Sequence, residues 1–132
     1  MKVISLNHAA LHVTNAARSA TFFREYCGME VIHTRTQADL TVKWVRIPSQ
    51  KDGFMLVLLE TLGDLSVEPG NMDHLGFFVE DRDGVDQIAA KAQAQGILLE
   101  GPVYAGPVIG YYCMIQDPDG YILEFSCEHA TV

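Results

Sequence analysis

The chain carries Asp119-Gly120-Tyr121-Ile122-Leu123-Glu124 sixty-seven residues after Asp52-Gly53-Phe54-Met55-Leu56-Val57. A second pair of matching segments, His8-Ala9-Ala10-Leu11-His12-Val13 and His74-Leu75-Gly76-Phe77-Phe78-Val79, is sixty-six residues apart. A repeat at about half the chain length indicates one supersecondary unit that has been duplicated and paired with its copy.

The repeat brings unusual residues into register. His8 aligns with His74, and Glu124 aligns with Val57. Imidazole and carboxylate groups are common ligands of divalent metals. Two histidines and a carboxylate at matched strand positions therefore make a candidate metal site.

Composition narrows the class of protein and of partner. With 132 residues, 48% apolar and 20% charged, the chain is long enough for one domain with a real core. The net charge of −8 and the pI near 4.9 disfavour nucleic acid and anionic membranes as partners. A small molecule or another protein remains.

Cysteine content and the N-terminus bear on location. Cys27, Cys113 and Cys127 have no metal-type spacing, and an odd number argues against a disulfide framework. Residues 1–6 are too short and too soon polar for a secretory signal, and no apolar run approaches the roughly 20 residues of a membrane span. We expect a cytoplasmic protein.

Turn and periodicity signals predict two β-α-β-β-β modules in a single domain, 1–132. Module one, 1–62, has expected strands at 6–13, 29–34, 40–48 and 54–60 and a helix between Asn15 and Gly28. A linker, 63–73, contains Pro69-Gly70. Module two, 74–132, has expected strands at 74–79, 97–100, 111–116 and 121–128, a helix from near Asp83 to Gly96, and a loop at 101–110. The predicted fold class is α+β.

Alternation along the first strand places His8, Ala10 and His12 on one face. The last hairpin turns at Asp117-Pro118-Asp119-Gly120, which has proline and glycine at the favoured turn positions. Met55 to Leu59 is continuously apolar, so that strand is expected to be covered on both faces.

The chain resembles the vicinal oxygen chelate superfamily, which includes glyoxalases, bleomycin-resistance proteins and extradiol dioxygenases. The resemblance rests on His8 opening a strand, on Asp73-His74-Leu75-Gly76-Phe77, and on the run from Asp117 to Phe125 that contains Glu124. It covers essentially the whole chain. It implies that the two modules form an open, curved mixed-sheet barrel around a metal.

The resemblance also implies the ligands. His8 and His74 would bind the metal from the first strands, and Glu124 from the last strand of module two. This set suits Fe, Mn, Ni, Co or Zn and leaves coordination positions for a substrate. The metal would polarise substrate oxygens as a Lewis acid.

The fourth ligand position differs from that of glyoxalase I, which carries a glutamate there. Val57 occupies it, and Glu60 lies three residues further on, which turns its side chain to the other face unless a bulge rotates it back. Three ligands favour non-haem Fe(II) or Mn(II) dioxygenase-like chemistry. A glyoxalase I-like lyase that recruits Glu60, and an antibiotic-binding protein of the bleomycin-resistance type, are the alternatives.

Further residues have candidate roles or expected positions. His12 is a candidate proton shuttle, and Tyr112 a candidate donor to a substrate oxygen. His129 is expected to lie in a fraying C-terminus. The superfamily resemblance implies a homodimer that acts on a small molecule.

Overall fold

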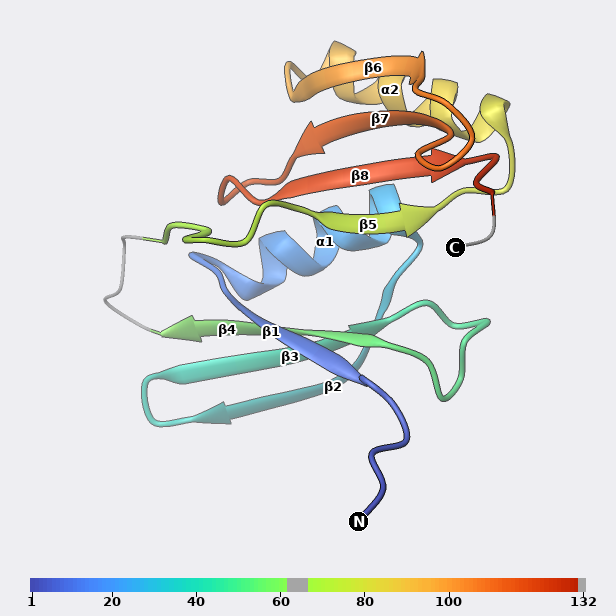
Figure 1. Ribbon diagram of the computed structural model, residues 1–132. Helices are drawn as coiled ribbons and strands as arrows, with labels where there is room; N and C mark the ends of the chain where they lie inside the picture. Colours follow the sequence, from blue (N-terminus) through green and yellow to red (C-terminus); the bar gives the residue numbers. More distant parts are fainter. Residues whose placement is uncertain (62–66, 131–132) are drawn as a thin grey trace. The chain divides into compact units, whose positions relative to one another are not determined.

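The computed structural model describes residues 1–61 and 67–130. The chain divides into unit one, Met1–Glu68, and unit two, Pro69–Val132. The division falls within the predicted linker, 63–73, of which residues 63–66 lie outside the described residues. Each unit has the element order β-α-β-β-β, which confirms the predicted α+β class and the duplication (Figure 1).

Unit one is a four-stranded mixed sheet with one helix. Its elements are β1 (His8–His12), α1 (Ala16–Cys27), β2 (Glu30–Gln37), β3 (Leu40–Arg46) and β4 (Met55–Thr61). The strand order is β1-β4-β3-β2, with β1 parallel to β4 and the other pairs antiparallel.

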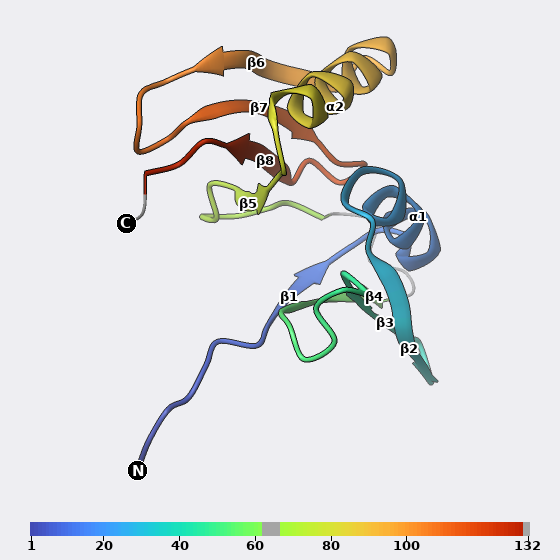
Figure 2. The same cartoon turned by 90° about the vertical axis from the view of Figure 1, so that its right-hand side faces the viewer.

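Unit two repeats this topology. Its elements are β5 (Leu75–Phe78), α2 (Arg82–Ala94), β6 (Leu98–Tyr104), β7 (Tyr111–Gln116) and β8 (Ile122–Cys127). The order is β5-β8-β7-β6, again with one parallel pair, β5 and β8. Figure 2 shows α2 beside β6 and β7, on one side of this sheet.

Local signals set where the helices begin and end. The Asn15 side chain caps α1 by accepting a hydrogen bond from the backbone N–H of Arg18 at 2.9 Å. Gly28 follows α1 in the left-handed conformation, at φ 64°. Asp81 caps α2 in the same way as Asn15 caps α1, so this helix begins slightly earlier than predicted.

Each sheet has one face against its helix and one without a helix, called here the helix-free face. In unit one, Leu56 and Leu58 are buried on the helix side, and Val57 points to the helix-free face. In unit two, Leu123 and Phe125 are buried on the helix side, and Glu124 points to the helix-free face. The helix-free faces therefore carry the aligned candidate site positions.

Strand β6 is longer than predicted. A short strand at 97–100 was expected because Gly101 and Pro102 favour a loop. In the structure the pairing with β7 shifts register between Glu100 and Val103 and then resumes to Tyr104. Proline is tolerated here because β6 is an edge strand.

Two expectations from the sequence concern the cysteines and possible membrane spans. All three cysteines are free thiols, and burial raises the pKa of the Cys113 thiol to about 11. Neither helix in residues 1–61 and 67–130 is long and apolar enough to cross a bilayer.

Candidate metal centre

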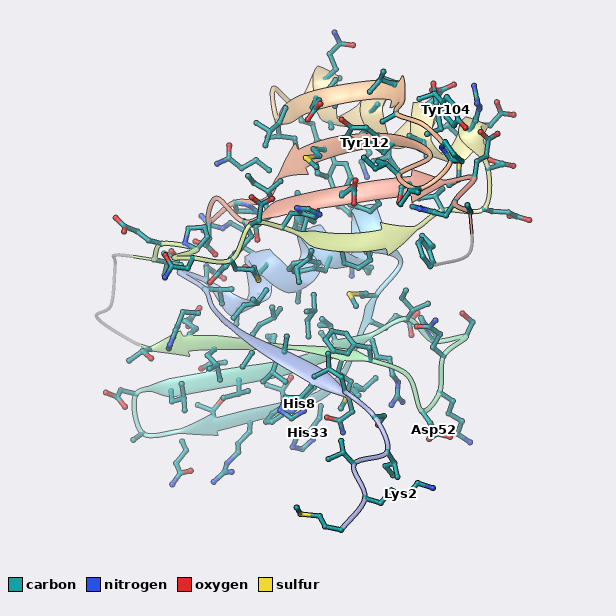
Figure 3. All side chains as sticks on the ribbon, in the orientation of Figure 1. Lys2, His8, His33, Asp52, Tyr104 and Tyr112 are labelled. Carbon is teal, nitrogen blue, oxygen red and sulfur yellow. The ribbon has the colours of Figure 1, made fainter. Side chains whose placement is uncertain are left out.

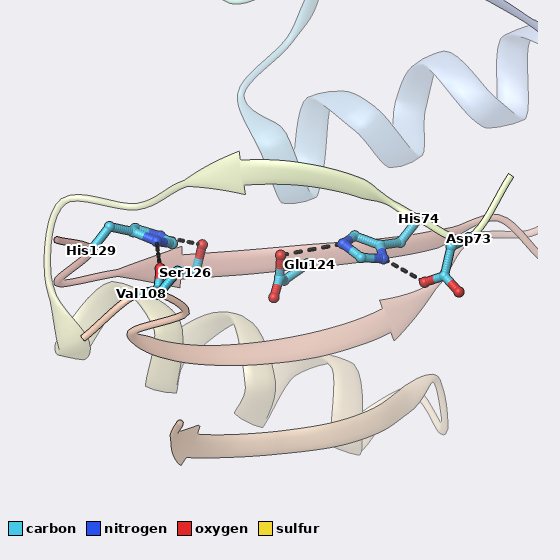
Figure 4. Close-up of polar contacts among 6 residues, drawn as sticks. All are labelled: Asp73, His74, Val108, Glu124, Ser126 and His129. Carbon is cyan, nitrogen blue, oxygen red and sulfur yellow. Dashed lines mark hydrogen bonds and ion pairs between the residues drawn. The ribbon is translucent and has the colours of Figure 1, made fainter. Parts of the chain in front are cut away.

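His74 and Glu124 lie side by side on the helix-free face of unit two (Figure 4). His74 directly precedes β5, and Glu124 lies in β8, opposite Gly76. The Nε2 atom of His74 is 3.4 Å from Oε2 of Glu124, and the two side chains are 33% and 17% exposed. A Cβ at position 76 would lie 3.8 Å from Oε2 of Glu124, so Gly76 leaves the carboxylate room.

A second carboxylate holds the other side of the His74 ring. The Nδ1 atom of His74 lies 2.6 Å from Oδ1 of Asp73. A carboxylate only accepts hydrogen bonds, so the hydrogen belongs to Nδ1. In a neutral ring, Nε2 then carries the lone pair, and this lone pair faces Glu124.

This arrangement fits a divalent metal. An imidazole nitrogen and a carboxylate oxygen 3.4 Å apart form an ion pair when the ring is protonated, and a neutral ring can bind a cation together with the carboxylate. A ligating histidine commonly donates its other N–H to a carboxylate, as His74 does to Asp73. The residues present are therefore suited to the metal that the sequence predicts.

The pair opens onto a cavity of about 360 Å³. Its other walls come from Tyr112 and Met114 on β7, from the loop before β7 and from the C-terminal segment, and include Val108, Ile109 and His129. The structure thus brings the predicted residues His74, Glu124 and Tyr112 to one cavity. Its lining is apolar apart from these groups and His129.

The remaining predicted ligand, His8, lies in unit one. It begins β1, on the helix-free face, and is exposed. Its Nδ1 atom lies 2.5 Å from Oδ1 of Asn7. His12, the candidate shuttle, ends the same strand on the same face. Figure 3 shows His8 on unit one and Tyr112 on unit two.

Within each unit, the described parts of the chain hold no cluster of three or more histidine, cysteine, aspartate or glutamate side chains arranged for a metal. Unit two alone provides a pair, His74 and Glu124. The pair by itself is two side chains, fewer than the three ligands expected from the sequence.

The sequence matches the family model of the Glyoxalase/Bleomycin resistance protein/Dioxygenase superfamily over residues 5–125. The chain belongs to this superfamily. An uncharacterized protein of Pseudomonas aeruginosa is 34% identical over 122 residues, which cover 92% of this chain and 87% of that protein.

Two further proteins that are similar to the chain have names that state an activity. A probable lactoylglutathione lyase of Vibrio parahaemolyticus is 26% identical over 121 residues, covering 89% of this chain and 86% of that protein. The structure of Leishmania major glyoxalase I matches with a TM-score of 0.79 at 22% identity, covering 96% of this chain and 88% of that one. The match to the Leishmania major structure confirms the glyoxalase-like fold of this superfamily member.

Glu60, the candidate fourth ligand, has a different partner in the structure. Its Oε1 atom accepts a hydrogen bond from the backbone N–H of Ala16, at 2.7 Å, in the first turn of α1. The pairing of β4 with β1 and β3 is regular from Met55 onward, without a bulge. Glu60 therefore lies on the helix side of the sheet, and Val57 on the helix-free face.

Tyr112 is held by a neighbouring carboxylate. Its hydroxyl donates to Oε1 of Glu100 at 2.5 Å. This hydrogen bond, with burial as the smaller cause, raises the pKa of the Tyr112 phenol above its ordinary value. The phenol stays neutral, and its oxygen keeps lone pairs that can accept a hydrogen bond.

His129 lines the cavity, so the expectation of a fraying C-terminus was wrong for this residue. Its Nδ1 atom lies 3.1 Å from the Val108 carbonyl oxygen, and its Nε2 atom 2.7 Å from Oγ of Ser126 (Figure 4). Glu128 turns the chain back with φ 59°, and the Arg82 guanidinium holds its carboxylate at 2.7 Å. A left-handed glutamate has no signal in the sequence, so His129 could not be placed from it.

Proposed function

We propose that this superfamily member is a metal-dependent enzyme in which His8, His74 and Glu124 bind one divalent ion beside a small-molecule substrate. The observation that carries the proposal is the contact between His74 and Glu124, 3.4 Å apart at the edge of a cavity. When bound, the ion would polarise one or two oxygen atoms of the substrate as a Lewis acid.

The chain's own residues would bind and orient the substrate. Val108, Ile109 and Met114 form an apolar wall of the cavity, against which an apolar part of the substrate would pack. The Tyr112 hydroxyl gives its hydrogen to Glu100, so its oxygen would accept a hydrogen bond from a substrate O–H or N–H. His12 remains a proposed proton carrier, on the same face of β1 as His8. The homodimer remains a prediction.

The first candidate reaction is dioxygenation on Fe(II) or Mn(II). This reaction is favoured because Val57, which cannot bind a metal, occupies the fourth ligand position on the helix-free face. Glu60, the alternative fourth ligand, is hydrogen-bonded to the first turn of α1. Two histidines and one carboxylate with open coordination positions are typical of non-haem iron oxygenases.

The second candidate is a lyase of the lactoylglutathione type. The lyase is favoured by the relative from Vibrio parahaemolyticus, which is 26% identical and is named a probable lactoylglutathione lyase. Oxygen uptake with a catechol separates the two candidates, because hemithioacetal isomerisation consumes no oxygen.

The test is metal content per chain, measured on protein without a histidine tag. We expect roughly one equivalent in the wild type and its loss in Glu124→Ala and His74→Ala. Glu30→Ala and His33→Ala are matched controls, because both residues lie on β2, at the opposite edge of the sheet from β1, and neither lines the cavity. The element found selects the assay. No metal after reconstitution would overturn the proposal and favour ligand binding without catalysis.

A further inference from the structure

Each candidate histidine ligand follows a residue whose side-chain oxygen holds its ring. In unit one, Oδ1 of Asn7 lies 2.5 Å from Nδ1 of His8. In unit two, Oδ1 of Asp73 lies 2.6 Å from Nδ1 of His74 (Figure 4). The same contact thus occurs at equivalent positions of the two units, with two different residue types.

The contact selects one form of the imidazole. An amide or carboxylate oxygen accepts a hydrogen bond, so it stabilises the ring form with hydrogen on Nδ1. The lone pair is then on Nε2, and the ring is turned so that Nε2 points away from the residue before it. For His74 this atom is the one that faces Glu124.

We propose that Asn7 and Asp73 are positioning residues, which fix His8 and His74 in the ring form and orientation that present Nε2 to a divalent metal. This inference rests on the proposed function. Neither residue has to touch the ion, because each acts through the histidine that follows it. Asp73 is 91% exposed, so burial in a core does not explain its contact with His74.

Asn7 and Asp73 differ in their strength as hydrogen-bond acceptors. The Asp73 carboxylate is a stronger acceptor than the Asn7 amide, because a charged acceptor makes the stronger hydrogen bond. His74 should therefore be the better ordered ligand. Removing a partner of this kind typically lowers metal affinity about 10–100-fold.

The experiment compares Asp73→Ala with Asp73→Asn, which retains an oxygen acceptor as Asn7 does. Titration calorimetry with Zn²⁺ should show an affinity about 10–100-fold lower for Asp73→Ala and largely restored in Asp73→Asn. Asn7→Ala should weaken binding in the same direction. Asp52→Ala, which removes an exposed carboxylate in the loop before β4, is the matched control.

A second measurement does not need the metal. Long-range ¹H–¹⁵N correlation spectra of the metal-free protein report which ring nitrogen of His74 carries hydrogen. We expect Nδ1 in the wild type and in Asp73→Asn, and a shift towards Nε2 in Asp73→Ala.

The outcomes separate the two proposals. If the wild type binds Zn²⁺ and Asp73→Ala binds it equally well, the positioning role is overturned and the metal site stands. If the wild type binds no Zn²⁺, the proposed function is overturned. The spectra of Asp73→Ala then still show whether Asp73 determines which ring nitrogen of His74 carries hydrogen. If His74 carries its hydrogen on the same ring nitrogen in Asp73→Ala as in the wild type, the positioning role of Asp73 is overturned as well.

Discussion

The Nε2 atom of His74 lies 3.4 Å from Oε2 of Glu124, across the parallel pair of strands β5 and β8. The register places Gly76, not His74, opposite Glu124. The imidazole therefore reaches along the strand direction to meet the carboxylate, over a position that has no side chain. A cation that fits between these two atoms gains a neutral and a charged ligand from one unit.

Metal should stabilise the fold through this pair. A ligand that binds only the folded chain raises the free energy of unfolding by about 2.7 kcal/mol at a hundred times its dissociation constant. We expect added Zn²⁺ to raise the melting temperature of the wild type and to leave that of Glu124→Gln nearly unchanged. Calorimetric or fluorescence melting checks this. An equal increase in both proteins would place the bound ion elsewhere.

Glu60 should act on stability and not on metal binding. Its carboxylate accepts a hydrogen bond from the Ala16 N–H and lies near the positive end of the α1 dipole. Glu60→Ala should lower the free energy of unfolding by about 1 kcal/mol, as the loss of a helix cap does. Glu60→Gln, which keeps an oxygen acceptor, should lose less. Urea unfolding gives both values.

The same Glu60 variants also test its candidate role as fourth ligand. Metal content per chain should equal that of the wild type in both. If Glu60→Gln folds normally and has lost its metal, Glu60 is a ligand, and the lyase reaction gains support.

Asp117 should make stability fall as pH rises. This residue is 4% exposed. Its Oδ1 atom accepts hydrogen bonds from the backbone N–H groups of Asp119 and Tyr121, and its Oδ2 atom has no hydrogen-bond partner among the described residues. Burial raises the pKa of the carboxyl from 3.8 to about 6, against the opposing effect of the backbone hydrogen bonds. The folded chain therefore holds this proton more tightly than the unfolded chain does.

The stabilisation that results is complete below the unfolded pKa, near 4, and is lost as pH rises through about 6. Relative to Asp117→Asn, the wild type should lose about 2–3 kcal/mol of unfolding free energy over this range. Denaturant unfolding of both proteins between pH 4 and pH 7 measures the difference. A difference that does not change with pH would contradict the prediction.

Tyr112→Phe should impair substrate use while sparing the metal. The variant loses the hydroxyl oxygen, which Glu100 orients. Tyr112 lines the same cavity as His74 and Glu124. One hydrogen bond to substrate corresponds to a decrease in kcat/KM of roughly tenfold. Metal content should be unchanged. Loss of metal in a folded Tyr112→Phe would mean that this residue supports the ligands themselves.

Much of this architecture follows from two regularities of the chain. The repeat predicted both β-α-β-β-β units, because a glycine ends the helix in each, Gly28 and Gly96, and another precedes the last strand in each, Gly53 and Gly120. Alternation along a strand placed Glu124 and Val57 on matching faces and turned Glu60 to the other side, and the regular pairing of β4 agrees. These features depend on local geometry, which residue type largely determines.

Other features depend on contacts that residue type does not determine. His129 reaches the cavity because Glu128 adopts a left-handed conformation and Arg82 holds it. The extension of β6 past Pro102 depends on its place at the sheet edge, where a missing N–H is tolerated. The oxygen acceptors before both histidines are visible in the sequence as Asn7-His8 and Asp73-His74, but only side-chain geometry shows their contact with Nδ1.

Gly76 has a consequence for how such a protein could change its activity. A Cβ there would meet the Glu124 carboxylate at ordinary van der Waals distance, so atoms added beyond it would crowd this carboxylate. One substitution at the surface of β5 could thus exclude the cation while Leu123 and Phe125 keep their packing beneath it. The proposed metal centre and the core therefore use opposite faces of the same sheet, so a single substitution could remove the first and leave the second intact.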